Sequence, residues 1–128
     1  QEKLVGVQFG DEHSVNPMAD TLSYHLIMSS KECMVVSMHN HPSVSLISVA
    51  DMRFFLQYGS IRLLVIVTNL GSISYMVKSR RYNYIKAVRL LNQTIQLHNK
   101  ASDLKEHQKA ARYFISNCHK AGIIYENR

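Results

Sequence analysis

Two histidines and an aspartate stand close together in the stretch "MHNHPSVSLISVAD". His39 and His41 are two positions apart, and Asp51 lies ten residues beyond His41. Alternate side chains of an extended chain point to the same side, so both imidazoles can reach one metal ion. Two imidazole nitrogens and a carboxylate oxygen are the three protein ligands of a catalytic zinc site, in which water takes the remaining position. This spacing therefore predicts a zinc centre formed by His39, His41 and Asp51.

The segments on either side of these residues predict a strand before the histidines and a helix after them. The short apolar run 33–38, "CMVVSM", is typical of a buried strand, and Pro42 stops further sheet pairing. Ser48 is a suitable N-cap for a helix over 49–58, which places Asp51 in its first turn. The Ser48-x-x-Asp51 spacing is also that of a capping box, which would explain both residues without a metal. Both explanations remain open at this stage.

The rest of the chain alternates between strand and helix patterns and indicates one α+β domain. A small mixed sheet flanked by helices is expected, with a C-terminal helical hairpin appended to it. In the first helix Met18, Leu22 and Leu26 form an apolar stripe, and Ser102 is expected to cap the last helix. The expected elements are a strand at 3–9, a helix at 15–31, strands at 33–38, 61–68 and 72–78, a helix at 49–58, and two helices within 82–120.

Composition and charge limit the classes of function. The chain has 128 residues, 46% of them apolar, and no apolar run long enough to span a bilayer. From Lys78 onward eleven Lys and Arg stand against three Asp and Glu, whereas the first 77 residues are slightly acidic. We therefore expect no membrane partner, and an acidic protein or a nucleic acid at the basic residues 78–128. Solvated helix surfaces would explain the same charges, and we expect Tyr82 and Tyr84 to pack rather than stack on bases.

The strings "HNHPS" and "SVAD" resemble the signature of the JAB domain, also called MPN or JAMM. "HNHPS" is closest to the RadC-type and the phage- or toxin-associated bacterial branches. The resemblance covers residues 1–78, leaving 79–128 as a basic helical extension packed on the same domain. It implies a three-layer fold similar to cytidine deaminase and a zinc metallopeptidase that cleaves peptide or isopeptide bonds. It also implies a cytoplasmic protein, or one delivered as part of a larger secreted or phage polypeptide.

The resemblance assigns a role to each site residue. It implies that His39, His41 and Asp51 bind Zn²⁺, and that Ser48 hydrogen-bonds the oxygen that becomes negative during amide cleavage. The general acid–base glutamate of the family lies upstream, where this chain offers Glu2 and Glu12. The six residues between His41 and Ser48 make this loop one residue shorter than in the deubiquitinase and RadC branches. Two alternatives stay open: a non-catalytic binding module of the same fold, and a RadC-like nucleic-acid-directed protein.

Overall fold

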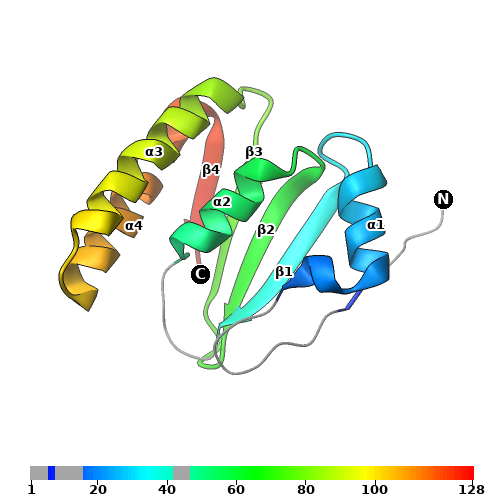
Figure 1. The fold of residues 1–128 in the computed structure, drawn as a ribbon, viewed down its shortest axis with the longest axis horizontal. Coiled ribbons are helices and arrows are strands. Elements are labelled where there is room, and N and C mark those ends of the chain that lie inside the picture. Colours follow the sequence, from blue (N-terminus) through cyan, green and yellow to red (C-terminus); the bar gives the residue numbers. More distant parts are fainter. Residues whose placement is uncertain (1–5, 8–15, 42–46) are drawn as a thin grey trace.

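The computed structural model confirms an α+β fold and describes residues 6–7, 16–41 and 47–128 (Figure 1). Its helices and strands alternate along the chain as the sequence predicts. They are η1 Pro17–Ala19, α1 Thr21–Ser29, β1 Val35–His41, α2 Val49–Gln57, β2 Ile61–Thr68, β3 Ile73–Lys78, α3 Tyr84–Lys100, α4 Leu104–Asn117, η2 Cys118–Ala121 and β4 Ile123–Asn127.

The four strands form one mixed sheet in the order β1-β2-β3-β4. β1 pairs with β2 in parallel, and the other two pairings are antiparallel. A tight turn joins β2 to β3, whereas the whole α3–α4 hairpin separates β3 from β4. The last strand is therefore part of the same sheet as the strands before residue 78.

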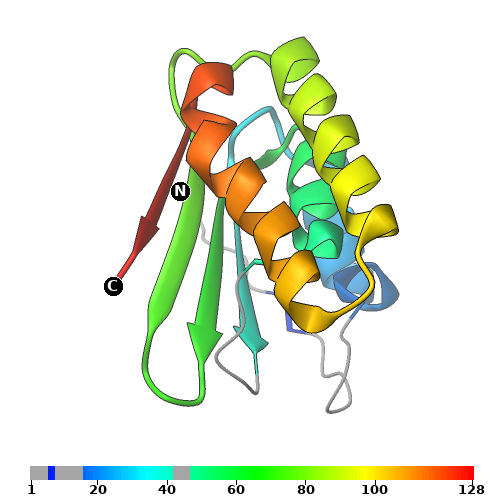
Figure 2. The same cartoon turned by 90° about the vertical axis from the view of Figure 1, so that its left-hand side faces the viewer.

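Helices α2, α3 and α4 lie on one face of the sheet, and α1 lies beside the edge strand β1 (Figures 1 and 2). On the opposite face Val36 and Met38 are 60% and 68% exposed. Within 6–7, 16–41 and 47–128 no helix covers that face, and the three-layer arrangement that the resemblance implies stays a prediction.

The core lies between the sheet and its helices and draws on both halves of the chain. Phe55 of α2, Leu64 of β2 and Met76 of β3 are fully buried, and so are Phe114 of α4 and Ile123 of β4. All five belong to one cluster of buried residues. The helical hairpin and the last strand thus complete the core around β2 and β3.

The first helix differs from its prediction. The chain forms a short 3-10 turn, and α1 then begins after Asp20, whose carboxylate caps it by accepting a hydrogen bond from the Ser23 N–H. This new start rotates the buried face onto Ser23 and Ile27 and leaves Leu22 39% exposed. The predicted Met18–Leu22–Leu26 stripe is therefore not the buried face of this region, although Met18 and Leu26 are half-buried.

Two other predictions concern the cap of α4 and the first strand. Asp103, not Ser102, caps α4, because its carboxylate accepts from the Glu106 N–H while the Ser102 N–H donates to the Glu106 carboxylate. The strand predicted at 3–9 lies outside the described residues except for Gly6 and Val7, which have no regular secondary structure.

Replacing Phe114 by alanine should lower the free energy of unfolding by about 3–5 kcal/mol, because it leaves a cavity under a fully buried ring. Urea unfolding followed by circular dichroism measures this change. Leu104→Ala, at a side chain 74% exposed on the same helix, is the matched control and should change stability by about 0.5 kcal/mol or less. Equal losses in the two variants would contradict a shared core.

Candidate metal centre

The end of β1 and the start of α2 bring His39, His41 and Asp51 together, as the sequence predicts. The Nδ1 atom of His39 lies 3.2 Å from one oxygen of the Asp51 carboxylate, and Nε2 of His41 lies 3.2 Å from the other. Alternation along β1 places both imidazoles on the half-buried side, while Asn40 is exposed. The three side chains are between 10% and 18% exposed, so the cluster is largely removed from water.

Ser48 and Asp51 also form the capping box at the start of α2. The Ser48 hydroxyl oxygen accepts from the Asp51 N–H at 3.1 Å, and the carboxylate accepts from the Ser48 N–H at 3.0 Å. The hydroxyl in turn donates to the same carboxylate oxygen at 2.8 Å. The capping explanation is therefore confirmed, and it coexists with the two histidine contacts.

These contacts keep the Asp51 carboxylate ionised. Burial alone would raise the pKa of this carboxyl. Hydrogen bonds from His39, His41 and Ser48 outweigh burial and hold the pKa of Asp51 well below its usual range. A negative charge is thus fixed at the first turn of α2, where the helix dipole also favours it.

The orientation of His39 is fixed by neighbours on both sides of its ring. Its Nε2 lies 3.2 Å from the Ser37 hydroxyl, and its ring packs against Phe54 with centroids 5.7 Å apart. A neutral imidazole that donates from Nδ1 to Asp51 has an acceptor left at Nε2 for the Ser37 O–H. Ser37 and Phe54 therefore support a residue of the cluster without being part of it.

The donor atoms of this cluster suit zinc, although the carboxylate now takes hydrogen bonds from the imidazoles. A tetrahedral zinc with bonds of about 2.0–2.2 Å separates neighbouring ligand atoms by about 3.3–3.6 Å, close to the 3.2 Å contacts here. In the described part of the chain, no three or more His, Cys, Asp and Glu side chains already have the arrangement of a metal centre. Binding zinc would require each imidazole to present a lone pair in place of its N–H.

Both candidates for the acid–base residue, Glu2 and Glu12, lie outside the described residues. Their position relative to His39, His41 and Asp51 therefore stays a prediction.

The structure also buries a cation that the sequence analysis assigned to the basic surface. Lys78 is 3% exposed, donates to the Tyr58 carbonyl at 3.1 Å and lies 4.6 Å from the centre of the Phe55 ring. Burial lowers the pKa of Lys78 to about 8. Alternation in β3 could have indicated this, because Lys78 follows the buried residues Ser74 and Met76 at steps of two.

A second histidine pair could not be read from the sequence. His98 of α3 and His107 of α4 contact each other through their Nδ1 atoms at 2.9 Å. Their separation along the chain matches no ligand spacing, and only the packing of the two helices brings them together. Their contact lies beside the turn that joins α3 to α4.

Comparison with known proteins finds no relative for this chain: no family model, no curated protein and no solved structure matches it. None of the helices in the described ranges is long and apolar enough to cross a bilayer. The cluster must therefore be interpreted from its own geometry.

Replacing Asp51 by asparagine should lower the free energy of unfolding at pH 7 by about 1–3 kcal/mol, because several donors lose a charged acceptor. A carboxyl with a lowered native pKa stabilises the fold above its unfolded-state pKa, and this contribution is lost on acidification. The difference between wild type and variant should therefore be constant near neutral pH and shrink below about pH 4. Denaturant unfolding at several pH values measures it.

Asp103→Asn is the control for loss of a capping carboxylate, because asparagine caps a helix about as well as aspartate does. It should leave stability nearly unchanged at every pH. A loss for Asp51→Asn no larger than for Asp103→Asn would show that the histidine contacts contribute nothing.

Proposed function

We propose that this protein is a JAB-like zinc-dependent hydrolase that cleaves a peptide or isopeptide bond. The observation that carries the proposal is the convergence of two imidazoles on one ionised, largely buried carboxylate at the end of a strand. A cap alone requires Ser48 and Asp51 but not His39 and His41. Both histidines lie within 3.2 Å of Asp51, and neither contact is needed to start α2.

In this proposal His39, His41 and Asp51 hold the metal. Bound zinc supplies a Lewis acid that polarises a carbonyl and lowers the pKa of water. Asp51 is already deprotonated, as a ligand must be, and the Ser37 and Phe54 contacts hold His39 in place. The low exposure of the three side chains limits the access of bulk water to their contacts.

Ser48 would hydrogen-bond the oxygen of the substrate that becomes negative. Its side-chain position is exposed, so a substrate can approach it. Its O–H now donates to Asp51 at 2.8 Å, so contact with substrate requires that hydrogen bond to be exchanged. Glu2 or Glu12 would carry the proton from the attacking water to the leaving amine.

A non-catalytic binding module is the second candidate. The capping box favours it, because the box explains the Ser48 and Asp51 hydrogen bonds with no metal. In such a module the histidines would stabilise a buried carboxylate and do nothing else.

Zinc titration of metal-free protein should show about one zinc per chain, lost in His39→Ala and His41→Ala. Isothermal titration calorimetry and elemental analysis measure affinity and stoichiometry. His25→Ala, at an exposed histidine of α1 that contacts Ser29, is the matched control and should keep the zinc. Absence of zinc from the wild-type protein after reconstitution would exclude the hydrolase and leave the binding module.

The acid–base assignment predicts that Glu2→Gln or Glu12→Gln abolishes cleavage of isopeptide-linked and peptide substrates while zinc is retained. Ser48→Ala should also retain zinc, slow cleavage and lower the free energy of unfolding by about 0.5–2 kcal/mol through loss of the cap. Cleavage unaffected by either glutamate substitution would disprove the assignment to these two residues.

A further inference from the structure

Five cations gather at the end of the sheet opposite to His39, His41 and Asp51. His41 pairs with Thr68 at the end of β2, whereas Lys78 pairs with Ile123 at the other end of the sheet. The turn after Lys78 and the first turns of α3 lie at this second end (Figure 1). We call the following residues the basic corner: Arg80, Arg81, Lys86, Arg89 and Lys120.

One hollow of the basic corner lies between α3 and the end of α4, with a volume of about 320 Å³. Its lining includes Lys86, Arg89 and Lys120 and no acidic residue. All three cations are exposed, and none takes part in a salt bridge with another residue of the described part. Their charges are therefore available to a ligand.

Neutral side chains of the same hollow add hydrogen-bond donors. The Tyr113 hydroxyl donates to the Gln93 carbonyl oxygen at 3.0 Å, which leaves the Gln93 amide N–H groups to donate. Asn117 donates to the Tyr113 carbonyl at 2.8 Å and is held against α4. The hollow thus combines three positive charges with the Gln93 amide group, which its hydrogen bond with Tyr113 holds in place.

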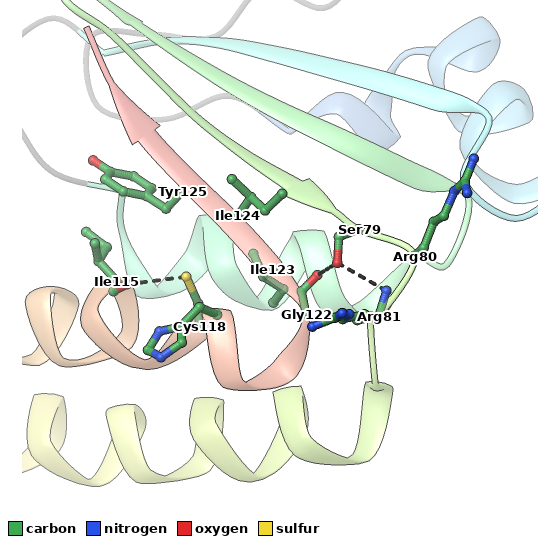
Figure 3. Close-up of a pocket in the computed structure, with 10 residues that line it drawn as sticks. Ser79, Arg80, Arg81, Ile115, Cys118, Gly122, Ile123, Ile124 and Tyr125 are labelled. Atoms are coloured by element: carbon green, nitrogen blue, oxygen red, sulfur yellow. Dashed lines mark hydrogen bonds between the residues drawn. The ribbon is translucent and has the colours of Figure 1, made fainter.

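The second hollow adjoins the Arg80–Arg81 turn, which packs tightly on η2 (Figure 3). The Ser79 hydroxyl donates to the Gly122 carbonyl at 2.6 Å and accepts from the Arg81 N–H at 3.2 Å. Gly122 has a φ of 76°, and a Cβ there would lie 2.3 Å from the Arg81 backbone. Only glycine allows this approach, which fixes the backbone of Arg81 beside the end of η2, while the Arg80 side chain points away from η2 (Figure 3).

The acidic residues of the α3–α4 hairpin lie at the end where the two helices are joined. Asp103 of the joining turn caps α4, and Glu106 lies in the first turn of α4. The first turn of α3 holds no acidic residue and contains Lys86. Because a helix N-terminus favours anions, a cation there is locally unfavourable. Residues that are locally unfavourable in this way are expected where a surface binds a ligand.

We infer that the basic corner binds the phosphate backbone of a nucleic acid. Unpaired cations and neutral amide donors are the groups that contact phosphate oxygens. Lysine is depleted from protein–protein interfaces, whereas Lys86 and Lys120 are central here, so an acidic protein fits less well. This inference does not depend on the metal site, which lies at the other end of the sheet.

Fluorescence anisotropy with labelled single-stranded and double-stranded DNA, measured at several salt concentrations, tests the inference. The triple variant Lys86→Ala, Arg89→Ala, Lys120→Ala should bind about tenfold or more weakly at low salt. The slope of log affinity against log salt should become shallower by about two to three for duplex, because each phosphate contact contributes about 0.9.

The matched control is Lys100→Ala, Lys105→Ala, Lys109→Ala, which removes the same charge at exposed positions near the other end of the α3–α4 hairpin. It should weaken binding less than about threefold and leave the salt slope unchanged. Equal losses in the two triple variants would overturn the inference in favour of diffuse charge attraction. Binding of polyglutamate at the corner without binding of DNA would overturn it in favour of an acidic protein. Thermal unfolding verifies that both variants fold.

Discussion

The parallel pairing of β1 with β2 constrains the whole arrangement around the candidate site. Two parallel strands require the chain to return from the end of the first to the start of the second, and α2 makes this return over one face of the sheet. The first turn of the returning helix therefore begins at the level where β1 ends. Residues at the end of β1 and in the first turn of α2 meet for this reason, although nine residues separate His41 from Asp51.

The Asp51 side chain stabilises the start of α2 and is also a proposed metal ligand. Its carboxylate completes the helix cap with Ser48 and accepts from both histidines. A metal would replace the two histidine hydrogen bonds and leave the backbone hydrogen bond of the cap in place. The cap can therefore hold the carboxylate in position whether or not a metal is bound, which is the preorganisation that a metal site requires.

The elements that could be predicted from sequence are those in which local signals agree. The run "IRLLVIVT" forms β2, and Ser48 caps α2, because apolar pattern and cap indicate the same boundaries. Predictions of burial were wrong at positions where the packing of the helices on the sheet determines which side chains are exposed. Tyr82 packs against the core as expected, but Tyr84 is 57% exposed because it starts α3 on the solvent side. The spacing of His39, His41 and Asp51 indicated their convergence. Two local N-cap candidates, Asn16 and Asp20, competed for the start of the first helix, and α1 begins after the second.

The position of β4 has a consequence for the order of folding. Its only partner among the described strands is β3, and the whole α3–α4 hairpin lies between them. Closing so long a loop directly would cost much chain entropy. The hairpin is built from local contacts that form quickly, and once formed it brings Ile123 beside Lys78. Completion of the sheet should therefore be a late, hairpin-dependent step, and substitutions in β4 should act mainly on the unfolding rate.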